Sequence, residues 1–285
     1  MLPNEKRFGQ AILILLLLVV AGLGGYQPPS RASEKIAVAV SIPPLAEFID
    51  SLAKEKVSVS VMLPPGASPH SYMLTPSQLV QVSQARMFVK VGLRKAERTV
   101  WMDKIIAANR DMLVVDSSKG IELIDMDPHI WLSPLNAKIM VQNIYDGLVS
   151  LAPNNETYYK QNRDSYFHNL DTLDQDIRGN LSGIENRAFI VFHPAWGYFA
   201  RDYNLEQIPI EIGSKEPSAQ DIVRLIHQAK ERNIKVIFAS PEFNPKSAQI
   251  IAKEIGGWVV FIDPLARDYM TNLRQVSAEL VQAMR

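Results

Sequence analysis

The 285-residue chain contains no cysteine. This absence excludes disulfide bonds, thiolate metal sites and a cysteine nucleophile, so a metal site would have to use His, Asp or Glu. The chain also lacks a charge excess, because 30 Lys and Arg residues balance 30 Asp and Glu residues. A nucleic-acid-binding protein usually has a basic excess, so no nucleic-acid partner is expected. The H-E-x-x-H and G-x-S-x-G signatures of common hydrolases are absent as well.

No apolar run reaches the length of a membrane span. The main run, residues 11–23, has about 13 residues, whereas a span needs roughly 20. Two basic residues precede the run and small residues follow it, up to Ala32, as in a secretory signal peptide. We therefore predict a signal peptide over residues 1–32 and a periplasmic mature chain beginning near Ser33. An uncleaved anchor is the alternative, and a lipoprotein is excluded because no cysteine follows the run.

Short β-branched runs alternate with helical patterns in both halves of the chain. The expected strands are residues 36–42, 57–63, 87–93, 112–117, 188–193, 207–212, 235–241 and 258–264. The expected helices are residues 44–55, 75–85, 98–109, 136–152, 218–233 and 244–257, with Ser133 and Pro134 capping the fourth. Strands that alternate with helices of this length indicate βαβ units and parallel sheets.

A long helical pattern separates the two halves. Its apolar residues recur at spacings of 7, 4, 3, 4 and 4; they are Tyr159, Tyr166, Leu170, Leu173, Ile177 and Leu181. We therefore predict an α/β protein of two lobes, each with a mainly parallel sheet flanked by helices, joined by one long rigid helix. The N-terminal lobe is expected over residues 33–152, the linking helix over 153–185 and the C-terminal lobe over 186–285.

Three of the five histidines stand where elements end. His70 follows a strand and a stiff Pro-Pro-Gly loop, His129 lies in a Pro-bounded loop before a helix, and His193 closes a strand. Asp263 occupies the same kind of position after the last strand, although an Asp-Pro pair there is more often a helix cap. The remaining two, His168 and His227, lie within polar helical patterns and are expected to have no special role.

Ligands of open α/β sheets bind beyond the carboxyl ends of the strands, where these four groups are expected. Three imidazoles and one carboxylate fill a tetrahedral zinc shell, and they also suit Mn²⁺ or Fe²⁺ with another geometry. Metal-bound histidines need their second ring nitrogen fixed by a partner. Asp127, two residues before His129, is a candidate for that role.

Five segments carry a family resemblance: "PPGASPHSY", "DPHIWLSP", "FHPAWGYF", "GSKEPSAQDI" and "IDPL". In this order, over nearly the whole mature chain, they resemble metal-binding solute-binding proteins of zinc/manganese ABC transporters. The resemblance implies two α/β lobes with the metal in the cleft between them, held by His70, His129, His193 and Asp263. Glu211 and Glu242 also end strands. They are candidates to hydrogen-bond the metal ligands, although cap or surface roles are the more common outcome.

The chain departs from the family pattern in ways that bear on its cargo. It has Met73 where an acidic residue often follows the first ligand, and it lacks the His-rich loop of many zinc-specific members. His193 stands where manganese-type relatives often have Glu, which favours zinc because imidazole suits zinc better.

The resemblance implies a carrier and not an enzyme. A monomer would capture Zn²⁺, or alternatively Mn²⁺ or Fe²⁺, outside the cytoplasmic membrane and deliver it to an ABC permease. Two other functions remain open from the residues themselves. One is a zinc hydrolase with three histidines and a water, in which Glu242 or Glu211 acts as the base. The other is a purely structural metal site, whose loss would unfold the protein.

Overall fold

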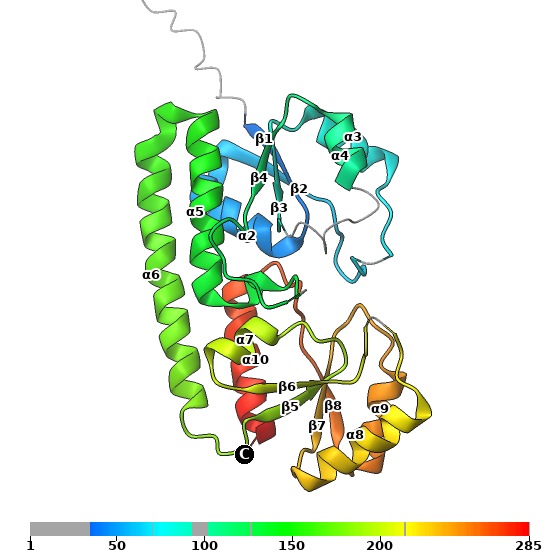
Figure 1. The fold of residues 1–285 in the computed structure, drawn as a ribbon. Coiled ribbons are helices and arrows are strands. Elements are labelled where there is room, and N and C mark those ends of the chain that lie inside the picture. Colours follow the sequence, from blue (N-terminus) through cyan, green and yellow to red (C-terminus); the bar gives the residue numbers. More distant parts are fainter. Residues whose placement is uncertain (1–34, 70, 93–101, 126, 214, 285) are drawn as a thin grey trace, which may run out of the picture. The chain divides into compact units, whose positions relative to one another are not determined.

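The computed structural model describes residues 35–69, 71–92, 102–125, 127–213 and 215–284, and residues from 35 onward form one compact unit. Figure 1 shows two sheets in this unit, with α5 and the long α6 beside them. The expected signal peptide, residue His70 and the start of the expected helix at Arg98 lie outside the described residues. Within the described part of the chain, no helix combines the length and apolar character that crossing a membrane requires.

The N-terminal lobe contains a four-stranded parallel sheet in the order β2-β1-β3-β4. Its strands are β1 (Ile36–Val40), β2 (Val57–Val61), β3 (Met87–Lys90) and β4 (Leu113–Asp116), and its helices are α2 (Pro43–Ala53), α3 (Pro76–Gln84), α4 (Met102–Ala108) and α5 (Pro134–Leu151). Side chains of α2 and α5 cover one face of the sheet, and those of α3 and α4 cover the other. The central strands β1 and β3 are apolar, apart from Lys90 at the end of β3, because both of their faces are buried.

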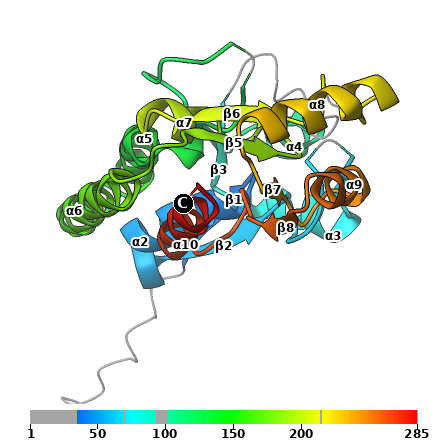
Figure 2. The ribbon, with the colours of Figure 1, turned by 90° about the horizontal axis from the view of Figure 1, so that it is seen from below.

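The C-terminal lobe repeats this arrangement in the order β6-β5-β7-β8, again all parallel. Its strands are β5 (Ala188–Val191), β6 (Glu206–Pro209), β7 (Val236–Ala239) and β8 (Trp258–Phe261), and its helices are α7 (Gly197–Asp202), α8 (Ala219–Glu231), α9 (Lys246–Glu254) and α10 (Tyr269–Met284). Helices α8 and α9 cover one face and α10 the other, as Figure 2 shows from below.

The long helix α6 (Glu156–Leu181) confirms the predicted linking helix. Its buried residues are the six that the spacing identified, and its 26 residues span about 39 Å. It packs against α2 and α5 of the first lobe and against α10 of the second. One hydrophobic core therefore runs through both lobes.

The structure confirms the predicted strands and helices of the described residues, with strand ends a few residues shorter, and the cap at Ser133, whose side chain accepts from Asn136 N–H. Two helices were not predicted. The six-residue α7 is too short to show a periodic pattern. Helix α10 does carry apolar residues at the spacing that indicates a helix, at Tyr269, Leu273, Val276 and Leu280.

A half-buried carboxylate ties the two lobes together near the start of α10. Glu47 on α2 accepts a hydrogen bond from the Tyr166 hydroxyl of α6 at 2.7 Å and another from the Tyr269 N–H at 2.5 Å. Burial raises the pKa of Glu47. Nearby, Arg267 pairs with Asp50 of α2 at 2.7 Å. These bonds fix the segment between β8 and α10, which contains Asp263.

Candidate metal centre

His129 lies in the loop between β4 and α5, directly before a buried turn of 3₁₀ helix, Ile130–Leu132. The Asp127 Oδ1 atom lies 2.7 Å from His129 Nδ1 and accepts the His129 backbone N–H at 2.9 Å. Asp127 thus fixes the ring as the sequence suggested. A carboxylate at Nδ1 favours the proton on that nitrogen, which leaves the Nε2 lone pair for a metal ion.

His193 follows β5 and is held in the same way by Glu211, which follows the neighbouring strand β6. Glu211 Oε2 lies 2.5 Å from His193 Nδ1, and both residues are buried. The Phe243 ring stacks on the imidazole, with ring centroids 4.6 Å apart. The expectation that Glu211 would more commonly have a cap or surface role was wrong. Burial raises the pKa of Glu211, and Glu216 adds a smaller effect in the same direction.

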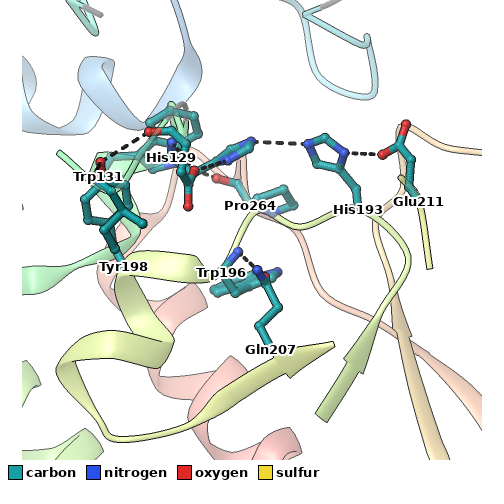
Figure 3. Close-up of polar contacts among 10 residues, drawn as sticks. His129, Trp131, His193, Trp196, Tyr198, Gln207, Glu211 and Pro264 are labelled. Carbon is teal, nitrogen blue, oxygen red and sulfur yellow. Dashed lines mark hydrogen bonds and ion pairs between the residues drawn. The ribbon is translucent and has the colours of Figure 1, made fainter. Parts of the chain in front are cut away.

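The two imidazoles face each other, with His129 Nε2 and His193 Nε2 3.3 Å apart (Figure 3). When both Nδ1 atoms carry the proton, two Nε2 lone pairs point toward the same space, which favours a cation there. Two nitrogens bound to tetrahedral zinc at 2.0–2.1 Å would lie about 3.4 Å apart. The observed separation therefore fits a shared zinc ion.

A small cavity adjoins the two rings. It has a volume of about 20 Å³ and is lined by Pro69, His129, Trp131, His193, Glu242, Phe243, Pro264 and Leu265. A cavity of this size holds one water or one ion, because a single water needs about 10–15 Å³. The lining residues therefore leave space for a single ion or water beside the two rings.

Asp263 lies beside this cavity and is not among its lining residues. One carboxylate oxygen accepts the Leu265 N–H at 2.7 Å, and the Asp263 carbonyl accepts from Asn272 on α10, also at 2.7 Å. Burial raises the pKa of the Asp263 carboxyl. Glu242 does line the cavity, and burial, followed by the charge of Asp263, raises its pKa to about 7.

The structure brings His129 and His193 together, two of the four predicted ligands. Among the described residues, no group of three His, Asp or Glu side chains is placed to hold a metal ion. His70 lies outside those residues, although its neighbour Pro69 lines the cavity. The four-residue ligand set therefore stays a prediction. His168 on α6 and His227 on α8 are exposed, as expected.

Glu242 should make the stability of the metal-free protein depend on pH. Its folded-state pKa of about 7 exceeds the ordinary value of 4.5, because the partly buried carboxyl is more stable neutral than ionised. The neutral group leaves the folded state fully stable below pH 4.5, and this stability is lost as pH rises through 7 and the carboxyl ionises. Glu242→Gln stays neutral, and we expect it to stabilise the protein at pH 8 by about 2 kcal/mol, or about 4–8 °C in Tm, after allowance for partial exposure. At pH 5 the gain should fall to roughly a quarter of this value.

Thermal melts in the presence of a chelator at pH 5 and pH 8 measure this difference. The matched control is Glu231→Gln, on the exposed surface of α8, which should change Tm little at either pH. An equal gain from Glu242→Gln at both pH values would show that the effect is not electrostatic.

The protein has two α/β lobes with one shared core, and two histidines that carboxylates fix beside a space for a single ion. These features define a metal-binding solute-binding protein. The chain belongs to the family ZnuA, described as zinc-uptake complex component A, periplasmic, whose model matches residues 38–283. Members of this family are transport components and not enzymes.

Two curated relatives show the extent of the similarity. The high-affinity zinc uptake system protein ZnuA of Bacillus subtilis (strain 168) is 30% identical over 282 residues, covering 88% of this chain and 86% of the relative. A putative metal-binding protein of Chlamydia trachomatis serovar D is 28% identical over 270 residues, covering 93% and 97%.

Solved structures share the fold described above. A crystal structure of ZnuA has a TM-score of 0.86 and 40% identity, covering 88% of this chain and 100% of that one. A ZnuA deletion mutant with zinc bound has a TM-score of 0.85 and 40% identity, covering 88% and 98%.

Proposed function

We propose that the protein captures Zn²⁺ between its lobes and delivers it to the membrane permease of an ABC importer. The observation that carries this proposal is the pair of imidazoles, each fixed at Nδ1 by a carboxylate, with Nε2 atoms 3.3 Å apart. The names of the relatives support it, because the Bacillus subtilis protein is a zinc uptake component and one similar structure contains zinc.

The proposed ligands are His70 and His129 from the first lobe and His193 and Asp263 from the second. The Leu265 N–H occupies one carboxylate oxygen of Asp263, and the other oxygen is the proposed metal ligand. A site with ligands from both lobes would be completed only when all the ligand loops are in place. Three imidazoles favour zinc over manganese, because imidazole nitrogen suits zinc and manganese prefers oxygen ligands.

The export of the chain, its oligomeric state and its partners are also part of the proposal. Residues 1–32 act as a signal peptide that exports the chain to the periplasm, where the mature protein works as a monomer. Its partners are the metal ion and the membrane permease. Membership of a periplasmic uptake family supports this arrangement.

Equilibrium metal titration tests the proposal. The protein is stripped by a chelator and then titrated with Zn²⁺ or Mn²⁺ in competition with a chelator of known affinity. We expect one tightly bound Zn²⁺ per chain and weaker binding of Mn²⁺. The control variant, His168→Ala with His227→Ala, removes two exposed histidines outside the site and should bind zinc as the unmodified protein does.

The titration separates the possible cargoes. Equal or tighter binding of Mn²⁺ would keep the carrier function and change the cargo. Failure to bind either metal, or zinc binding that disappears in the control variant, would contradict the proposal.

A further inference from the structure

The loop that contains Asp127 and His129 belongs to the first lobe in sequence, but a tyrosine of the second lobe holds it. The buried hydroxyl of Tyr198 on α7 accepts the Ile124 N–H at 2.9 Å and donates to the Asp127 carbonyl at 3.2 Å (Figure 3). Both bonds go to backbone atoms, so they fix the path of the loop just before His129.

Two further bonds hold the chain after His129. The Trp131 indole donates to the Pro264 carbonyl at 2.7 Å, and the Ser133 hydroxyl donates to the Asp202 carboxylate at the end of α7. The segment that presents His129 is therefore bonded on both sides to elements of the second lobe, which also contains His193.

Gly197, the first residue of α7, lies directly against this loop. A Cβ atom at position 197 would lie 2.4 Å from Asp127 Oδ2, well below any real contact distance. The backbone of Gly197 does not have a positive φ, so its conformation does not require glycine. The requirement comes from the carboxylate of Asp127, whose other oxygen fixes the His129 ring.

We propose that Gly197 and Tyr198 are positioning residues for metal binding, which hold the Asp127–His129 pair from across the lobe junction. This inference rests on the proposed zinc-binding function. Any side chain at position 197 pushes the Asp127 carboxylate away, because the carboxylate is the more movable of the two groups. The His129 ring then loses its fixed orientation relative to His193 Nε2. Neither residue contacts the metal itself.

Zinc titration of four proteins tests the inference: the unmodified chain, Gly197→Ala, Asp127→Asn and the double variant. Loss of a partner that fixes a ligand typically weakens metal binding by about 10–100-fold, and we expect this loss for each single variant. If Gly197 acts through Asp127, the double variant should bind within about threefold of Asp127→Asn alone. A merely structural role would multiply the two losses instead.

A second readout and a second variant separate positioning from folding. Bound Co²⁺ should show a changed visible spectrum in Gly197→Ala, because the ligand orientation changes. The control Gly179→Ala, on α6 with nothing within 4 Å of the added Cβ, should match the unmodified chain in affinity and spectrum. Tyr198→Phe keeps the ring and removes both loop bonds, so it should also weaken zinc binding. This variant still tests the inference if Gly197→Ala fails to fold.

The outcomes are distinct. The inference would be overturned if Gly197→Ala and Tyr198→Phe bound zinc with an affinity within twofold of that of the unmodified chain. It would also be overturned if the two losses of affinity multiplied fully in the double variant. Either result would leave the zinc-carrier function standing. Failure of the unmodified chain to bind zinc would overturn both.

Discussion

Replacing His129 or His193 with alanine is expected to weaken zinc binding by about 10²–10³-fold. Four-ligand zinc sites have apparent binding free energies of about 10–16 kcal/mol, so one imidazole contributes roughly 3–4 kcal/mol. Each 1.4 kcal/mol corresponds to a tenfold change in affinity, which gives the expected range. The structure makes the two losses comparable, because each ring is fixed by its own carboxylate and presents Nε2 to the same space.

Competition titration of the two variants measures this effect. The metal-free variants should melt near the temperature of the metal-free unmodified chain, which separates lost binding from lost folding. Affinities within tenfold of the unmodified protein would remove His129 and His193 from the ligand set. Glu211→Gln offers an intermediate case, since it leaves the His193 ring in place and loses only the charge that fixes it, at an expected cost of about 10–100-fold.

The fold could be predicted from the sequence because its signals are local. The strands β1 and β5 are short apolar runs, and α6 carries a long apolar stripe on a polar helix. Parallel sheets follow from the alternation of strands and helices. Helix α10, which was not predicted, carries the same kind of local signal, because its buried residues also recur at helical spacing.

The candidate site could be predicted only in part. His129 and His193 were recognisable because each lies next to a proline, the first in a loop before a helix and the second just after a strand. Asp127 was recognisable because it lies two residues from His129. The pairing of His193 with Glu211 depends on β6 lying beside β5, and strand order is a property of the tertiary fold. The role of Gly197 depends on α7 meeting a loop about 70 residues earlier in the sequence, which no local pattern encodes.

Zinc is expected to raise the melting temperature by about 8–16 °C, while the metal-free protein remains folded. At a free zinc concentration a thousandfold above Kd, binding stabilises the native state by about 4 kcal/mol. For a domain of this size, each 1 kcal/mol shifts Tm by about 2–4 °C. Melts followed by circular dichroism, with and without chelator, measure the shift.

The hydrophobic core gives the reason that the metal-free state should survive. Residues of both sheets, of α6 and of α10 form one apolar cluster, and the bonds of Glu47 to Tyr166 and Tyr269 join the lobes through residues that do not line the cavity. None of these contacts needs a metal ion, whereas a structural metal site supplies folding free energy that the chain lacks without it. A chain that lost its helical signal in chelator would be a metal-stabilised scaffold. A folded metal-free chain with a large zinc-dependent shift has the property that a carrier needs, because it must release its cargo and bind again.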